Sequence, residues 1–464
     1  MLATKNIRMF SSSLKSVLVN QIPSQQEYIK SLKQNYGNVI VDKVSLNQIL
    51  SGSRGIKSMY WEQSLLDQNE GIRIRGYSIP ECQEKLHKFN KTGEIQPESM
   101  FWLLMTGEIP NNEQLQNFQK EIKTRSNLPE YVSNFLQRLP HDIHPMNALS
   151  MGLMMCQNLS NFKKAYDNKL NKETYWEHTY EDALDIFAKI PLIASIFYRR
   201  KYFNDMQDLP KYDENKDYSE NLCNMMGYGE NKELHDYMRL YLSIHSDHEG
   251  GNASAHTSHL VNSTLADPYI SIASGVNALS GPLHGSANSE VLKWLLDLKY
   301  YLKDNNKEIN DENIKDFILK TLESGNVVPG YGHAVLRITD PRYDCQREFS
   351  LKHMKDDELF LIVDKLFQVA PEVLKNNSKI QNPYPNVDSH SGIILWHYGI
   401  REMEYYTVLF AISRTMGMLS QILWNRALNM PIERPKSINS DFIDKYLKNR
   451  YSKDKYWYNY KYII

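Results

Sequence analysis

The sequence has little of several features that define common protein classes. Only four cysteines occur among 464 residues, and Cys82, Cys156, Cys223 and Cys345 form no CxxC pair. A disulfide framework or a zinc ribbon is therefore not expected, and buried reduced thiols are the simpler interpretation. Glycine is also scarce, with 21 residues, which favours helices over a turn-rich β fold.

Charge and hydropathy exclude two further classes. The 54 Lys and Arg residues are balanced by 55 Asp and Glu residues, so the basic excess typical of nucleic-acid-binding proteins is missing. The uncharged stretch 268–289 is long enough to cross a bilayer, but Asn277, Pro282 and His284 make it too polar for lipid. The basic and aromatic segment 445–464 could stack on single-stranded nucleic acid, although packing on a neighbouring subunit fits a neutral chain better. We expect a soluble protein with no membrane span and no nucleic-acid partner.

Several catalytic signatures are absent. The chain has no G-x-S-x-G nucleophile elbow, no Gly-Lys dipeptide of a phosphate-binding loop, no H-E-x-x-H motif and no G-x-G-x-x-G motif. Serine-hydrolase, P-loop and Rossmann functions therefore lose most of their support.

Apolar residues recur at three- and four-residue spacing through most of the chain, which predicts helices. Alternation typical of strands is weak and is confined to 38–44 and 71–77. We therefore predict a mostly α fold, with its clearest helices at Ser99–Met105, Tyr180–Tyr198, Ser289–Leu302, Asn310–Leu322, Asp357–Phe367 and Glu402–Leu428.

The first 26 residues differ in composition from the rest of the chain. They contain Lys5, Arg8, Lys15 and several serines, and the first acidic residue is Glu27. This composition predicts a mitochondrial transit peptide over residues 1–26, and the run after Arg8 resembles a processing site. A disordered N-terminal tail is the alternative.

Four histidines lie close together in IHSDHEGGNASAHTSHL, at His245, His248, His256 and His259. A zinc site is one interpretation, but the spacing does not match known zinc motifs. Anion binding or a loop-holding role is the other.

Two more histidines lie in glycine-bearing segments. His284 precedes a well-patterned helix, whose N-terminus would bias the imidazole toward its neutral form. His333 follows Pro329, Gly330 and Gly332, which permit a tight turn and close backbone approach. A single such histidine is usually structural, but two in these settings suggest function.

Two charged residues add to this set. Asp388 precedes an apolar run, where it is either a helix N-cap or a partly desolvated general base. Arg414 lies within an apolar helix, so it needs an anionic partner, either an internal carboxylate or a carboxylate of a ligand. Neutral histidines, an aspartate base and arginines suit proton abstraction next to a carbonyl on a substrate that carries carboxylates.

Five segments carry a resemblance to a known family. IHSDHEGGNASAHTSHL, SGPLHGSAN, VVPGYGHAVLRITDPRY, NPYPNVDSHSG and PIERPKS resemble mitochondrial-type citrate synthase, and the resemblance runs from about Ser51 to Ser437. It implies a mostly α-helical homodimer of the mitochondrial matrix that needs no cofactor and no metal. A small domain, residues 285–399, would close over the active site of a large domain, residues 27–284 and 400–464.

The resemblance also implies the reaction, a step of the tricarboxylic acid cycle. Asp388 would remove a methyl proton from acetyl-CoA while His284 steadies the thioester oxygen of the forming enol. The enol would attack the ketone of oxaloacetate, with His333 supplying a hydrogen bond or proton, and citryl-CoA would be hydrolysed to citrate and CoA. The implied oxaloacetate ligands are His248, Arg342, Arg414 and Arg434, the last reaching across from the partner subunit. The implied CoA contacts are Arg54, Val327, Val328, Gly330 and Tyr331.

Two departures and two rival functions accompany the resemblance. Gln381 stands where the family often has lysine, which predicts weaker CoA affinity, and the aromatic, basic C-terminus is unusual. A 2-methylcitrate synthase that uses propionyl-CoA would carry the same catalytic residues. A structural protein that assembles further, with secondary activity, is the rival from another class.

Overall fold

The computed structural model describes residues 13–203, 212–376, 380 and 382–451 of the chain. The chain divides into two compact units, residues 1–430 and 431–464. Each unit is described separately below. The proposed division at residues 285 and 399 lies within the first unit, and it stays a prediction.

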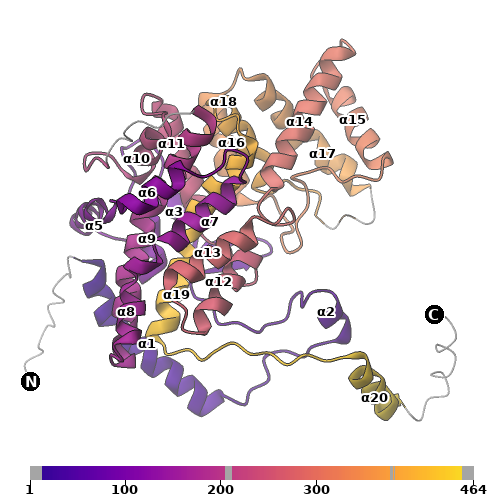
Figure 1. Ribbon diagram of the computed structural model, residues 1–464. Coiled ribbons are helices and arrows are strands. Elements are labelled where there is room, and N and C mark those ends of the chain that lie inside the picture. Colours follow the sequence, from indigo (N-terminus) through magenta and orange to yellow (C-terminus); the bar gives the residue numbers. More distant parts are fainter. Residues whose placement is uncertain (1–12, 204–211, 377–379, 381, 452–464) are drawn as a thin grey trace, which may run out of the picture. The chain divides into compact units, whose positions relative to one another are not determined.

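Helices dominate the first unit (Figure 1). Short 3₁₀ helices occur at Gln157–Leu159, Lys172–Thr174 and Met403–Tyr405, and a π-helical turn at Arg199–Phe203. The α-helices are α1 (Leu14–Tyr36), α2 (Leu46–Leu50), α3 (Ile79–Lys85), α4 (Pro97–Thr106), α5 (Asn112–Arg125), α6 (Glu130–Gln137), α7 (Pro145–Met155), α8 (Asn161–Asp167), α9 (Tyr175–Tyr198), α10 (Tyr218–Met226), α11 (Lys232–Ile244), α12 (Ala253–Ser263), α13 (Pro268–Leu279), α14 (Ala287–Asp304), α15 (Asp311–Glu323), α16 (Pro341–His353), α17 (Glu358–Lys375), α18 (Asp388–His397) and α19 (Tyr406–Ala427).

One small antiparallel sheet accompanies these helices. Its strands β1 (Ser64–Asp67), β2 (Gly71–Ile74) and β3 (Tyr77–Ser78) are hydrogen-bonded in sequence order. The prediction of a strand over 71–77 is therefore confirmed for Gly71–Ile74, after which the chain turns at Arg75 and Gly76 into β3. The β1–β2 turn packs against the start of α16, because a Cβ atom on Gly71 would lie 2.5 Å from the Cδ of Pro341.

The prediction of a second strand, over residues 38–44, is wrong. Val39, Ile40 and Val41 are 61%, 76% and 71% exposed, and no strand of the described residues pairs with them. Their β-branched composition favours an extended backbone, but a strand exists only where a partner accepts its hydrogen bonds.

The core forms around α9 and α19, which pack directly against each other. On α9, the apolar stripe formed by Ala183, Ile186, Phe187, Ile190 and Ile193 is fully buried, and most of the remaining surface of that helix is buried as well. A helix that is apolar on all sides belongs in the interior of a large domain. All six helices predicted from periodicity are confirmed. Most of their ends shift by a few residues, but α17 continues to Lys375, well beyond the predicted end at Phe367. All four cysteines are free and buried, as predicted.

The N-terminal helix α1 is part of this core. Ser13 caps it in a reciprocal capping box with Ser16, and Leu14, Leu18 and Ile22 are at most 3% exposed. Residues 14–26 of the predicted transit peptide therefore lie in a folded, packed helix.

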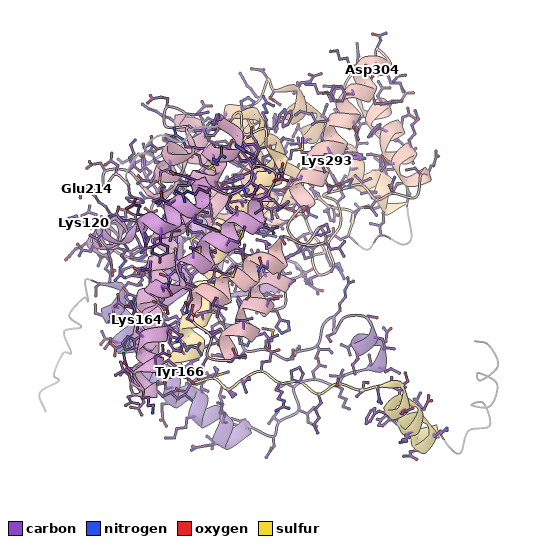
Figure 2. All side chains as sticks on the ribbon, in the orientation of Figure 1. Lys120, Lys164, Tyr166, Glu214, Lys293 and Asp304 are labelled. Carbon is purple, nitrogen blue, oxygen red and sulfur yellow. The ribbon has the colours of Figure 1, made fainter. Side chains whose placement is uncertain are left out.

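Helices α14, α15, α17 and α18 pack against one another. Exposed charged residues cover their outer faces, as Lys293 and Asp304 do on α14 (Figure 2). In the described part of the chain, no helix combines the length and apolarity that crossing a bilayer requires. The second unit contains α20 (Ser440–Tyr451), where the rings of Phe442 and Tyr446 stack at 6.0 Å. Arg434 lies in the irregular stretch before α20 and is exposed.

Candidate active site

His284 lies in the turn between α13 and α14, where a second helix fixes its protonation. The backbone N–H of Ser254, in the first turn of α12, donates to Nε2 of His284 at 3.2 Å, and the Ser254 hydroxyl lies 2.9 Å from the same nitrogen. Burial lowers the pKa of His284 to about 4, and the charge of Arg414 adds to this effect. The ring is therefore neutral at physiological pH, and its proton is on Nδ1. The N–H group that bonds to the ring comes from the start of α12 rather than from α14, the helix that follows His284 in sequence.

His333 is also neutral, but its proton is on the other nitrogen. The backbone N–H groups of Val335 and Leu336 donate to Nδ1 at 3.0 and 3.1 Å, which leaves the proton on Nε2. Burial and the nearby charge of Arg342 lower the pKa of His333. Its ring centroid is 5.9 Å from that of His248. Each of the two candidate catalytic histidines thus offers one N–H donor.

Asp388 is the first residue of α18, and its side chain does not cap the helix. Its backbone N–H donates to Oδ1 of Asn386 at 3.0 Å. The N-cap interpretation is therefore wrong. Burial raises the pKa of Asp388 to about 6, while Arg342 and Arg414 act in the opposite direction. A half-buried carboxyl that ionises near neutral pH is suited to act as a general base.

Backbone bonds join the Asp388 loop to the glycine turn that carries His333. Asn386 donates its N–H to the carbonyl of Gly330 at 2.9 Å, and the N–H of Gly332 donates to the Tyr384 carbonyl at 3.0 Å. Gly330 has a φ of +79°, and a Cβ there would lie 2.4 Å from the Ser389 hydroxyl. Only glycine lets the two loops approach so closely.

Arg414 on α19 is 2% exposed and has no carboxylate within ion-pair distance among the described residues. Its guanidinium donates to the His245 carbonyl at 3.4 Å and to Oδ1 of Asn252 at 3.0 Å. Burial lowers its pKa to about 10, so it stays charged at neutral pH. Buried cations are normally paired, so this charge fits an anionic ligand.

Arg342 and His248 both interact electrostatically with Arg414. Arg342, 5% exposed, pairs with Asp340 through Nε and Nη2, at 3.0 and 2.6 Å. Nε2 of His248 is buried and has no hydrogen-bond partner within the described chain. Burial, together with the charge of Arg342, holds the pKa of His248 well below its ordinary value. The arginine charges thus act on all three histidines and on Asp388.

A cavity of about 570 Å³ opens beside His333. Its walls include three of the predicted CoA contacts, Val327, Val328 and Tyr331. Gly330 shapes the adjoining turn, while Arg54 is exposed on a separate loop and does not line this cavity.

Comparisons with known proteins identify the family. The family model for "Citrate synthase, C-terminal domain" matches residues 52–436. The chain is 48% identical to citrate synthase 4, mitochondrial, of Arabidopsis thaliana over 445 residues, and 49% identical to the mitochondrial citrate synthase of Xiphias gladius over 441. Each alignment covers 95% of this chain and 93% of the relative. The chain belongs to the citrate synthase family.

The fold agrees with this assignment. The crystal structure of citrate synthase from Pyrobaculum aerophilum, 27% identical, matches with a TM-score of 0.72 over 84% of this chain and 92% of that one. The resemblance seen in the sequence and the mostly α fold are confirmed. The mitochondrial relatives also support the location in the mitochondrial matrix.

Some predicted residues are not brought to the site. Arg434 belongs to the second unit, which is not placed relative to the first. Gln381 lies outside the described residues. Two members of the histidine cluster bond elsewhere: Nδ1 of His245 pairs with the Tyr241 carbonyl and Nδ1 of His259 with Asn425. In the ranges that the structure describes, no group of three or more His, Cys, Asp or Glu side chains is arranged to hold a metal.

Sequence reasoning missed Asn252 and Ser254, which connect the site residues to one another. Both lie within the motif that contains His248, where α12 begins. The available signal was the N-cap preference of asparagine before a helix. That preference predicts a cap, but it does not predict which distant residues the cap contacts.

Proposed function

We propose that the chain condenses acetyl-CoA with oxaloacetate and hydrolyses the product to citrate and CoA, with His284, His333 and Asp388 as its catalytic residues. Membership of the citrate synthase family makes the chain an enzyme of this activity. The observations that carry the residue roles are the fixed tautomer of each histidine and a half-buried carboxyl, that of Asp388, whose pKa is about 6.

The first step breaks a C–H bond of the acetyl group. Asp388, ionised above pH 6, accepts the methyl proton, and the electron pair moves toward the thioester oxygen. The Nδ1–H of His284 donates to that oxygen and stabilises its developing charge without reorganisation. A histidinium in this position would be a stronger acid, but α12 and burial keep the ring neutral.

The second step forms the new C–C bond. The enol carbon attacks the ketone of oxaloacetate, and the oxygen of that ketone takes its proton from Nε2 of His333. The proton that Asp388 accepted from the methyl group is released to solvent, from which the His333 ring regains its own, so both groups return to their starting states. Arg342, Arg414 and the unpartnered Nε2 of His248 would bind the two carboxylates. Water then adds to the thioester carbonyl, the C–S bond breaks, and CoA leaves as the thiol.

We propose further that the site lies between two domains and is completed by a second subunit. His248, His284 and Arg414 belong to the proposed large domain, and His333, Arg342 and Asp388 to residues 285–399. The two connections between these parts are joined to each other, because Thr407 bonds to the Gly285 carbonyl at 2.9 Å and Ser289 bonds to the Met403 carbonyl at 2.9 Å. Paired connections of this kind support a hinge, and closure would exclude water until condensation is complete. Arg434 would reach the site of the partner subunit.

Release of free thiol, followed with a thiol-reactive dye, tests the function directly. Release should need acetyl-CoA and oxaloacetate together and be much slower with propionyl-CoA. A preference for propionyl-CoA would move the assignment to 2-methylcitrate synthase, and no release with either acyl-CoA would contradict the proposed activity.

Two variants test the roles. Asp388→Ala should lower kcat by at least about a thousandfold and leave oxaloacetate binding largely intact. Asp311→Ala, which removes the carboxylate from the same first position of α15, is the matched control and should leave kcat unchanged. Arg414→Ala should mainly weaken oxaloacetate binding. Near-normal turnover of Asp388→Ala would remove Asp388 from the base role, and unchanged oxaloacetate affinity of Arg414→Ala would contradict its role.

A further inference from the structure

Asn252 connects the buried Arg414 to the start of α12. Its Oδ1 accepts hydrogen bonds from Nη1 of Arg414 and from the backbone N–H of Ala255, each at 3.0 Å, and it lies 2.9 Å from the Ser254 hydroxyl. The bond from Ala255 is the N-cap of α12. The bond to Arg414 is not needed for capping.

The other end of the same amide holds the turn that contains His248. Nδ2 of Asn252 donates to the carbonyl of His248 at 2.9 Å and to the carbonyl of Glu249 at 2.6 Å. Glu249 has a φ of +58°, a conformation that side-chain-bearing residues adopt at a cost. Neighbouring bonds must therefore hold this turn in place, and Asn252 supplies two of them.

The acetyl-CoA half of the site depends on the same helix end. The Ser254 N–H, two residues after Asn252, bonds to Nε2 of His284 and fixes its tautomer. One amide side chain thus touches an arginine for oxaloacetate, the backbone of a second oxaloacetate ligand, and the helix end that orients a catalytic histidine.

We propose that Asn252 is a positioning residue of the citrate synthase reaction, holding Arg414 and His248 in the geometry that binds oxaloacetate while it keeps the start of α12 directed at His284. This inference rests on the proposed function. Capping alone does not require asparagine, because serine caps helices about as well. A short hydroxyl side chain cannot reach Arg414 and donate to two carbonyls at once, so serine separates the two roles.

Asn252→Ser is therefore the central test. We expect its thermal midpoint to stay within a few degrees of wild type, since the cap is kept. The KM for oxaloacetate should rise about tenfold or more, with a severalfold loss of kcat and little change in the KM for acetyl-CoA. Asn111→Ser, the same substitution at the N-cap of α5, is the matched control and should change neither KM.

Two more variants complete the test. Asn252→Ala should lose stability as well as oxaloacetate affinity, because the cap is removed. Asn252→Asp keeps an acceptor for Arg414 but presents a carboxylate oxygen to the carbonyls of His248 and Glu249, and it should also raise the KM for oxaloacetate.

Wild-type kinetic constants in Asn252→Ser would overturn the inference. So would a uniform loss of activity that follows a fall in the thermal midpoint, since that pattern indicates a structural role only. An inactive wild-type enzyme would instead contradict the proposed function. In that case calorimetric titration with oxaloacetate still tests Asn252, because the variant should bind about tenfold more weakly than wild type.

Discussion

Asp388 connects the chemistry of the site to pH through a single proton. Its ionised form is the proposed base, and burial raises its pKa to about 6. The value of kcat/KM for acetyl-CoA should therefore rise about tenfold per pH unit below pH 6 and level off above it. Steady-state kinetics between pH 5 and pH 8 measures this profile. A flat profile down to pH 5 would contradict the role of Asp388 as base.

The same raised pKa predicts a cost in stability. The folded state binds the Asp388 proton more tightly than the unfolded chain, whose aspartates titrate near 3.8. The penalty is therefore absent below about pH 4, grows between pH 4 and pH 6, and is complete above pH 6. Asp388→Asn should be more stable than wild type by roughly 3 kcal/mol at pH 7.5, although it should be inactive. Thermal midpoints should converge as the pH falls through this window; a variant less stable than wild type at pH 7.5 would contradict the prediction.

At the scale of elements, α1 limits where the transit peptide can end. Leu14, Leu18 and Ile22 are buried, and Lys15 pairs with Glu181 on α9 at 3.1 Å. Removing residues through Gln26 would take these side chains out of the core. The loss in folding free energy would be about 1.5–3 kcal/mol for each large apolar side chain. We therefore expect the cut to fall after Arg8 and before Leu14, which is a shorter leader than the 26 residues that composition suggests.

Mass spectrometry of the protein isolated from mitochondria measures this position directly. A truncation that begins at Ser13 should fold and be active, whereas one that begins at Glu27 should be strongly destabilised. A natural N-terminus at residue 27, in stable protein, would contradict the expectation.

Helices were predictable from sequence where the apolar periodicity continued over many residues, as in α9 and α19. Burial of one side of a helix requires apolar residues at the helical spacing along its whole length. The strand predicted at 38–44 does not form, because propensity carries no information about a pairing partner. Within the site, the motif residues could be named from their resemblance to a family, but the tautomers could not. They depend on backbone N–H groups of Ser254, Val335 and Leu336, which only the folded chain brings to the rings.

At the scale of the whole molecule, the proposed dimer predicts that Arg434 acts on the site of the partner subunit. This residue lies in the second unit, on an exposed stretch that follows α19. Combining two inactive variants in one dimer distinguishes the two arrangements. The activity that returns differs according to whether Arg434 acts within its own subunit or on the partner. In a symmetric dimer each chain contributes to two sites, so the distribution of defects over those sites is decisive.

Co-expression of Asp388→Ala with Arg434→Ala makes this distinction. If Arg434 acts across the interface, a mixed dimer has one site with both defects and one intact site. Random pairing makes half of the dimers mixed, so about a quarter of all sites, and of wild-type thiol release, should return. If Arg434 acts within its own subunit, every site keeps one defect and activity stays at the level of the single variants. Separately tagged chains, purified through both tags, provide the mixed dimer alone, for which the expected activity is about half of wild type.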